Sequence, residues 1–197
     1  RSVWPFDFKG KSDPSPVPIK LLNQKIGSVS CGMDFIIFCT EIGQLYSMGK
    51  TNSCGELGVG DFNPRFEPTL ISSLSVSGDI AQQVSCGLKH VIMRNQNGKV
   101  FTWGSGAHGQ LGVGVRKNAI RPVLVKTPDA SVKAKSVQAG YHCSYLLFEN
   151  RKIFHAGALA STNSENLHFR PFNFEHKVIL FNVRYSEQLK FLTNLLL

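Results

Sequence analysis

The fold is decided by residues 84–114, which read VSCGLKHVIMRNQNGKVFTWGSGAHGQLGVG, because the chain contains this pattern more than once. Residues 29–60 read VSCGMDFIIFCTEIGQLYSMGKTNSCGELGVG, so that Gly32 and Gly87 occupy the same position 55 residues apart. After a one-residue slip, the glycines of the closing GVG motif lie 54 residues apart. Self-similarity at a fixed period of this length indicates a repeat architecture.

A third and more divergent copy follows the first two. Gly140 stands where the second copy has Gly87, and Gly157 stands where it has Gly104, each 53 residues later. This copy has no trace of the G-x-L-G loop, and Arg151 replaces its turn glycine. The residues that define the repeat are glycines and one histidine: Gly32, Gly43, Gly49, Gly58, Gly87, His90, Gly98, Gly104, Gly109, Gly112, Gly140 and Gly157.

The repeated pattern resembles the repeat of the regulator of chromosome condensation family. That repeat reads roughly (I/V)-x-C-G-x-x-H, a glycine turn, an aromatic-x-x-Gly, then G-Q-L-G-x-G and a proline-led strand. The second copy matches nearly every element, whereas the first has Phe35 and the third Cys143 at the histidine position. The resemblance covers about residues 16–175, and it implies blades of a seven-bladed β-propeller that mostly binds other proteins.

We therefore expect an all-β chain of antiparallel four-stranded blades, forming a partial propeller with a short C-terminal helix. The expected units are the back half of a preceding repeat (1–27), repeat one (28–79), repeat two (80–135), a degenerate repeat three (136–177), and a strand with a helical tail (178–197). That tail either caps the stack or leads into a following domain. About three of seven blades do not close a ring, so we expect other parts of a longer parent chain, another chain or terminal caps to cover the exposed blade faces.

Within the second copy, strands are expected at 90–96 and 99–103, joined at Asn97-Gly98, with further strands of this repeat at 121–126 and 132–139. Asn-Gly between apolar runs favours a type I′ hairpin, in which both central residues have positive φ. Ile42-Gly43 fits this turn less well, because isoleucine disfavours positive φ. Asn150-Arg151 lacks the glycine, which predicts a differently shaped turn.

The outer strands and the core follow from the same alignment. A proline leads each expected outer strand, where no ladder N–H is needed; the four are Pro16, Pro68, Pro122 and Pro171. Trp103 and Met48 each follow an aromatic residue by two positions and are expected on the same sheet face. The side chains expected to be buried are Ile36, Phe38, Leu45, Tyr46, Val91, Met93, Val100, Phe101, Leu146 and Phe154.

Composition excludes several classes of protein. A hydrophobic content of 42% with 18% charged residues excludes an intrinsically disordered chain, and no apolar run is long enough to span a bilayer. The cysteines number five, and Cys31 and Cys86 occupy the same position in successive copies. We interpret them as small buried residues rather than disulfide halves, which favours a reducing compartment, the cytosol or the nucleus.

The formal net charge of +9 is unevenly distributed. Residues 116–135 contain one carboxylate, Asp129, and six basic side chains: Arg116, Lys117, Arg121, Lys126, Lys133 and Lys135. Such a basic segment could bind phosphate groups, an acidic lipid surface or an acidic protein partner. Alternatively, it is a solvated pair of outer strands that carry lysine on their edges.

The sequence offers little catalytic chemistry. Residues 104–109 spell G-x-G-x-x-G, but the glycine-rich GQLGVG that follows cannot open the helix that a dinucleotide site needs. His90 is expected to hydrogen-bond a neighbouring backbone carbonyl. The histidines and cysteines show no C-x-x-C or H-x-x-x-H spacing. We therefore expect no enzyme, no cofactor and no metal.

The candidate partner-binding residues are those at which the copies disagree. Asp34, Lys89 and His142 share one position, two residues after the repeat glycine, and differ in charge. His108, Arg116 and Lys117, in and just beyond the G-x-L-G-x-G loop, extend this surface. Agreement at the glycines defines the scaffold, and disagreement between them is where a specific surface can be built.

Three functions remain open at this point. The first is a non-catalytic protein-interaction module, a scaffold or adaptor. The second, implied by the resemblance, is a guanine-nucleotide exchange factor for a small Ran-like GTPase, although no segment matches the protruding β-wedge such a factor uses. The third is association with chromatin or nucleic acid through the basic residues 116–135, although aromatic side chains are not interleaved with them.

Overall fold

The computed structural model describes residues 24–128, 131–158 and 165–172, which form three four-stranded antiparallel sheets and one short helix. The first sheet consists of β1 (Ile26–Cys31), β2 (Phe35–Thr40), β3 (Leu45–Gly49) and β4 (Arg65–Leu70). The second consists of β5 (Ala81–Cys86), β6 (His90–Asn95), β7 (Val100–Gly104) and β8 (Ala119–Leu124). The third consists of β9 (Ala134–Ala139), β10 (Cys143–Phe148), β11 (Ile153–Ala158) and β12 (Glu165–Pro171).

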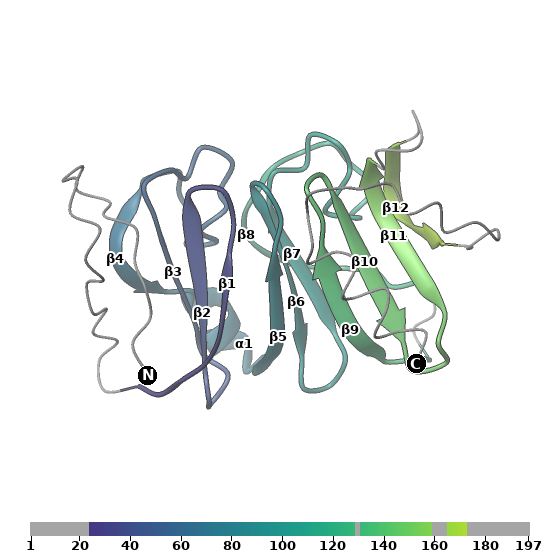
Figure 1. The fold of residues 1–197 in the computed structure, drawn as a ribbon, viewed down its shortest axis with the longest axis horizontal. Coiled ribbons are helices and arrows are strands. Elements are labelled where there is room, and N and C mark those ends of the chain that lie inside the picture. Colours follow the sequence, from purple (N-terminus) through teal and green to yellow (C-terminus); the bar gives the residue numbers. More distant parts are fainter. Residues whose placement is uncertain (1–23, 129–130, 159–164, 173–197) are drawn as a thin grey trace, which may run out of the picture.

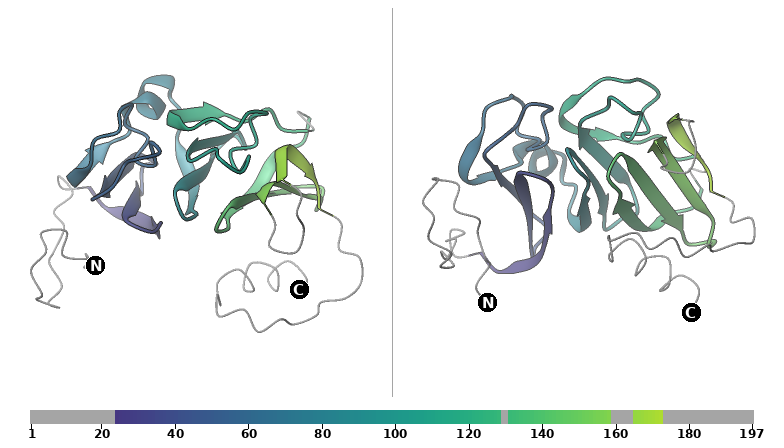
Figure 2. Two further views of the ribbon diagram at one scale, coloured as in Figure 1. Left: turned by 90° about the horizontal axis from the view of Figure 1, so that it is seen from above. Right: turned by 45° about the horizontal axis from the view of Figure 1, so that its top comes forward.

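The sheets stand side by side in chain order, as the blades of a propeller do (Figure 1). Seen from above, they lie along an open arc, so the described residues do not close a ring (Figure 2). The strands β1, β5 and β9 are neighbours along the inner side, and β4, β8 and β12 are the outer strands. The predicted all-β class and the partial propeller are confirmed. The predicted C-terminal helix and Pro16 fall outside the described residues.

Two apolar cores lie between the blades. One joins the first blade to β6 and β7 of the second, and the other joins the second blade to the third. All ten side chains that were predicted to be buried are buried. Trp103 shares its cluster with Phe101, and Met48 shares its cluster with Tyr46, as expected for residues two apart in a strand.

Inner strands of neighbouring blades are joined by serine side chains. The Ser30 hydroxyl accepts a hydrogen bond from the backbone N–H of Cys86 at 2.9 Å. One blade further on, the Ser85 hydroxyl accepts from the N–H of Ala139 at 3.0 Å. These bonds satisfy inner-strand N–H groups that have no strand on that side, and therefore hold consecutive blades in a fixed relation.

The glycine-rich loops close each blade against the next. No helix opens after Gly109; residues 107–111 form turns, which agrees with the exclusion of a dinucleotide site. Leu57 and Leu111 are completely buried beneath these loops. At Gly58, φ is +69° and an added Cβ would lie 2.7 Å from Nε1 of Trp103, so only glycine fits there.

The hairpin turns differ from the prediction. Of their residues, Gly43 (φ 78°), Gly98 (φ 79°) and Arg151 (φ 63°) have positive φ, whereas Asn97 and Ile42 do not. The N–H of Gly98 donates to Asn95 O at 3.1 Å, and the N–H of Arg151 donates to Phe148 O at 3.0 Å. The predicted type I′ turn is therefore wrong, as is the expected change of shape at Arg151. All three turns end in one left-handed residue, the pattern of a three-residue hairpin with a bulge.

Three strand predictions also need correction. Residues 132–139 were assigned to the second repeat, but β9 pairs with β10 and is the inner strand of the third sheet. Pro68 and Pro122 lie inside β4 and β8 rather than at their starts, at register irregularities on an edge where no ladder bond is lost. Pro171 was expected to begin an outer strand, but it is the last residue of β12. It pairs with Phe154, just as Leu124 at the end of β8 pairs with Phe101.

The apolar run after Pro68 also behaves differently from the prediction. It leaves the sheet at Leu70 and continues as α1 (Ser72–Ser77). This helix ends at Gly78, whose left-handed conformation stops it, and it buries Leu74.

Burial of the cysteines is less complete than expected. None of the five forms a disulfide, in agreement with the prediction. Cys86 is only half-buried and Cys31 is exposed, so their interpretation as buried residues is wrong. Both lie at the end of an inner strand, where Cys86 packs against the edge of the first apolar core without being fully covered.

Candidate functional site

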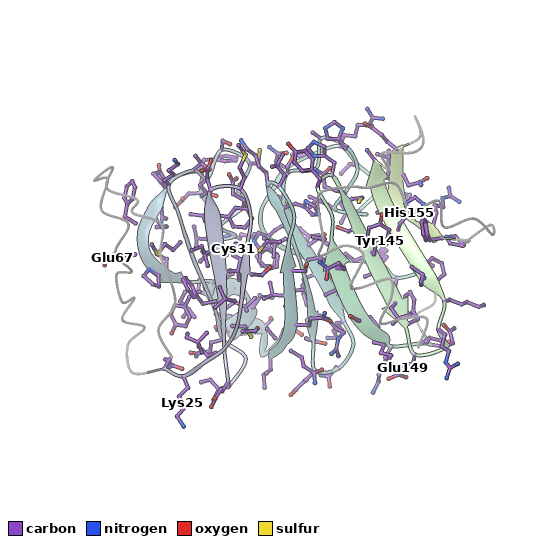
Figure 3. The ribbon with its side chains drawn as sticks, in the orientation of Figure 1. Lys25, Cys31, Glu67, Tyr145, Glu149 and His155 are labelled. Atoms are coloured by element: carbon purple, nitrogen blue, oxygen red, sulfur yellow. The ribbon has the colours of Figure 1, made fainter. Side chains whose placement is uncertain are left out.

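The turns and loops that carry the candidate residues gather at one end of the blades. We call this end the rim and define it by the turns at residues 32–34, 87–89 and 140–142 and the loops at 50–64 and 105–118. Antiparallel strands bring these connections to the same end, because each follows a strand that runs in the same direction. The hairpin turns form the opposite end, where Lys25 and Glu149 lie in Figure 3.

Backbone hydrogen bonds join the three inner turns of the rim into one row. The N–H of Met33 donates to the carbonyl of Leu88 at 3.1 Å, and the N–H of Leu88 donates to the carbonyl of Tyr141 at 3.2 Å. The side chains of these turns are therefore presented at a spacing that the backbone sets.

Each candidate residue of an inner turn contacts a glycine-rich loop. Lys89 Nζ donates to Ser53 Oγ at 3.2 Å, in the loop of the preceding blade. The ring of His142 lies 4.4 Å from the ring of His108, again in the preceding blade's loop. Asp34 instead forms an ion pair with Lys50 of its own blade, at 3.6 Å.

Glu165 gathers the candidate residues between the second and third blades. His108 Nδ1 lies 2.8 Å from one Glu165 oxygen, and the Arg116 guanidinium lies 2.6 Å from the other. The hydrogen bond from His108 and the charge of Arg116 hold the pKa of Glu165 below its usual range. Partial burial, with the neighbouring His108, lowers the pKa of His142.

The structure thus brings His108, His142 and Arg116 together, while Lys89 and Asp34 lie along the inner row. Lys117 is exposed in the same loop, and its carbonyl lies against Gly106. Sequence reasoning missed Glu165, because the third copy has lost the glycine loop that would have aligned its outer strand. The roles of all these residues in partner binding stay predictions.

Sequence reasoning also missed an apolar row on the rim. Met33 and Tyr141 are 63% and 55% exposed, and Leu88 is half-buried between them. The signal was present in the sequence, since each of the three directly follows the repeat glycine.

His90 is structural rather than part of the exposed surface. It is completely buried, and its Nε2 lies 3.0 Å from the hydroxyl of Ser144 on β10. Its hydrogen-bond partner is thus a hydroxyl of the next blade rather than the backbone carbonyl that was expected, and Nδ1 has no partner among the described residues. Burial lowers the pKa of His90 to about 4, so the ring is neutral at pH 7.

Within the described ranges, no group of three His, Cys, Asp or Glu side chains is placed to hold a metal ion. The same part of the chain contains no helix long and apolar enough to cross a membrane.

Four-stranded antiparallel sheets that are closed against one another by glycine-rich loops define a repeat protein of the β-propeller class. The family model described as "Regulator of chromosome condensation (RCC1) repeat" matches residues 43–93 and 97–147, and a second model of the same description matches residues 81–110. The chain belongs to this repeat family.

Relatives with curated names share part of the chain. The mouse serine/threonine-protein kinase Nek9 is 33% identical over 139 residues, 70% of this chain and 14% of the relative. The RCC1 domain-containing protein RUG3, mitochondrial, of Arabidopsis thaliana is 39% identical over 122 residues, 62% of this chain and 26% of the relative. Human protein RCC2 is 28% identical over 177 residues, 79% of this chain and 34% of the relative. The chain thus spans about a third or less of these relatives.

Solved structures share the fold. Human WBSCR16 superposes with a TM-score of 0.69 at 20% identity, over 81% of this chain and 40% of that one. Yeast RCC1 (Prp20), in its complex with Kap60, superposes with a TM-score of 0.67 at 18% identity, over 81% and 40%. Prp20p of Saccharomyces cerevisiae, from a study of its binding to Gsp1p and histones, gives a TM-score of 0.63 at 21% identity, over 75% and 34%.

Proposed function

We propose that the chain is a non-catalytic protein-interaction module whose rim binds a protein partner. One observation carries this proposal: the rim repeats its backbone from blade to blade while its side chains differ. Met33, Leu88 and Tyr141 are joined by repeated backbone bonds, yet the next positions hold an acid, a base and a histidine. A rigid backbone with varied exposed side chains is the arrangement of a specific recognition surface.

The electrostatics of the rim support recognition rather than catalysis. Glu165 is held by His108 and Arg116, which keep its pKa low and its charge fixed. Paired charges of this kind give a surface its specificity in binding. A general acid or base at neutral pH instead needs a pKa close to 7.

Proteins of the same fold give general support. Yeast Prp20 has been solved in complex with Kap60, and Prp20p has been studied for its binding to Gsp1p and histones. Nek9, a relative named as a kinase, matches this chain over only 14% of its own length, and we propose no kinase activity for these blades. The proposed location remains cytosolic or nuclear, although RUG3 is named as mitochondrial.

The test compares charge reversals at the two ends of the blades. Lys89→Glu and the double variant Arg116→Glu/Lys117→Glu alter the rim, and Lys152→Glu on the opposite hairpin is the matched control. Proteins captured by the wild-type full chain are purified, and their direct binding to each variant is measured by calorimetry. We expect the rim variants to weaken binding by about tenfold, as for losing a strong contact, and Lys152→Glu to leave it unchanged. Equal binding by all variants, with melting temperatures unchanged, would refute the proposed site.

Nucleotide exchange is the second candidate function, because Prp20p, which has a similar structure, has been studied for its binding to Gsp1p. Its test is the rate of nucleotide release from a purified small GTPase of the Ran type, with and without the full chain. Acceleration of tenfold or more, about 1.4 kcal/mol of barrier, would place exchange above a simple adaptor role.

Nucleic-acid binding is less well supported by the arrangement of the basic segment. Arg116 and Lys117 lie on the rim, whereas Lys133 packs beside Gly98 at the opposite end. The guanidinium of Arg121, on the outer strand β8, lies against Gly60 of the rim loop at residues 50–64. The positive charges are therefore spread along the blade rather than collected into one groove, as a phosphate backbone would require.

A further inference from the structure

We propose that the rim binds an extended acidic segment of a partner protein, with an apolar partner side chain on the row Met33–Leu88–Tyr141 and partner carboxylates at Lys89 and Lys117. This inference rests on the proposed function and specifies the chemistry of the partner.

The apolar row supplies the anchor. Met33 and Tyr141 are large side chains that stay more than half exposed, although both stand on turns that backbone bonds hold in place. Tyrosine and methionine are both enriched in binding surfaces, and tyrosine loses little conformational entropy on binding. The rings of Tyr141 and His142 meet edge to face at 4.5 Å, which further orients the tyrosine.

The charge of the partner follows from which rim charges are already paired. Asp34 is paired with Lys50 at 3.6 Å, and Glu165 with Arg116 at 2.6 Å. A third partly exposed carboxylate of the rim, Asp61, is paired with Arg65 at 2.6 Å.

Two cations of the rim remain without a carboxylate. Among the described residues, neither Lys89 nor Lys117 has an acidic partner, and the one side-chain contact of Lys89 is the neutral Ser53 hydroxyl. The remaining carboxylate of the rim loops, Glu56, is completely buried and accepts a backbone N–H at 2.7 Å, so the uncompensated charge that faces a partner is positive. It lies beside the apolar row at Lys89, which directly follows Leu88. A partner segment that places Asp or Glu next to a Leu, Met or aromatic residue complements both features.

The experiment is a selection from a random peptide display library on the full chain, followed by fluorescence polarisation with the selected peptides. We expect enrichment of peptides in which acidic residues flank one large apolar residue. Tyr141→Ser and Met33→Ser should each weaken their binding by about tenfold, as for a buried anchor. Lys89→Glu and Lys117→Glu should each weaken it by about three- to tenfold, with a loss that shrinks as salt is raised.

Matched controls lie at the opposite end. Ile42, 62% exposed on a hairpin turn, is as exposed as Met33, so Ile42→Ser tests the loss of an exposed apolar side chain elsewhere. Lys152→Glu tests a charge reversal elsewhere. Both should leave peptide affinity within about twofold of the wild type, the scale of a surface change without a direct contact.

Several outcomes would overturn the proposal. It fails if no peptide is selected, if the selected peptides are basic or lack an apolar residue, or if the rim variants bind them as the wild type does. It also fails if a short single-stranded oligonucleotide binds the wild type more tightly than the peptides do and if the same rim variants abolish that binding. Loss of captured-protein binding in Lys89→Glu, with no peptide selected, would retain the proposed function and reject only the linear acidic segment. Captured-protein binding that is unaffected by all rim variants would reject the proposed function itself.

Discussion

The two junctions between blades use one backbone plan and different aromatic side chains. Gly58, in the loop of the first blade, lies directly over Trp103 of β7, whose Nε1 donates to Glu56 O at 3.0 Å. Gly112, in the loop of the second blade, lies over Phe169 of the outer strand β12. At the position of Trp103 the third blade has the small residue Ala156. The glycine thus determines where an aromatic ring must lie, but not which strand supplies it.

The histidine position differs between the junctions in the same way. At the first junction this position holds Phe35, which joins the apolar cluster. At the second junction it holds His90, which contacts the Ser144 hydroxyl. One junction therefore gains apolar burial where the other gains a buried polar contact, and the two should respond differently to substitution and to pH.

The largest expected effect comes from removing the aromatic ring at each junction. Trp103→Ala should lower the free energy of unfolding by about 3–5 kcal/mol, because a completely buried ring and its hydrogen bond are lost. Phe169→Ala should cost about 3 kcal/mol if Phe169 has the equivalent role at the second junction. Urea denaturation measures both. A loss below about 1 kcal/mol for Phe169→Ala would show that the junctions are not equivalent.

The second prediction concerns the glycine over the ring. Gly58→Ala should cost about 3 kcal/mol, from left-handed backbone strain together with a Cβ that would clash with Trp103. Gly78→Ala is the matched control, because φ is +71° there but nothing lies within 4 Å of an added Cβ. Its cost should be only the strain, roughly 1 kcal/mol. Equal costs at the two glycines would contradict the close approach of the loop to Trp103.

The third prediction separates the junctions by pH. His90 has a pKa of about 4 in the folded chain, where burial disfavours the charged ring, and 6.5 as its ordinary value. The unfolded chain therefore binds the proton more readily, and stability falls as the pH falls from about 6.5 toward 4. Between pH 7 and pH 5 the loss should be about 2 kcal/mol.

The control replaces His90 by the residue of the first junction. His90→Phe should reduce this acid-induced loss, although it leaves the Ser144 hydroxyl without its ring partner and lowers stability at pH 7. Denaturation at both pH values measures the two effects. An unchanged pH dependence in His90→Phe would assign the titration to another group.

The repeat made much of the fold predictable. Glycine spacing identified the blades, and the alignment of the copies identified buried residues such as Val91 and Phe154. Predictions failed where local sequence does not decide the geometry. Whether β9 belongs to the second or the third blade is a question of pairing, and the positive φ of Arg151 is imposed by the strands on either side.

The candidate site was predictable only in part. The positions of Lys89 and His142 follow from the repeat, so their place on the rim could be inferred from the sequence. Glu165 could not, because it meets His108 only after the third blade has packed against the second. Residues 57 positions apart, without a repeat to align them, carry no local signal of such a contact.

The smallest expected effect returns to the hairpin turns, where the second and third blades have the same backbone but different residues. Arg151 adopts φ 63° at the position of Gly98, with nearly the same turn hydrogen bond, 3.0 Å against 3.1 Å. A side chain in this conformation destabilises the folded state by roughly 1–2 kcal/mol, and glycine removes that strain. Glycine also stabilises the unfolded chain by about 0.4–1 kcal/mol, because it has more conformational entropy there. Arg151→Gly should therefore raise the free energy of unfolding by about 0.5 kcal/mol, measured by urea denaturation against Lys152→Gly, a neighbouring site where no positive φ is relieved. A destabilised Arg151→Gly variant would mean that the arginine side chain contributes more than its backbone strain costs.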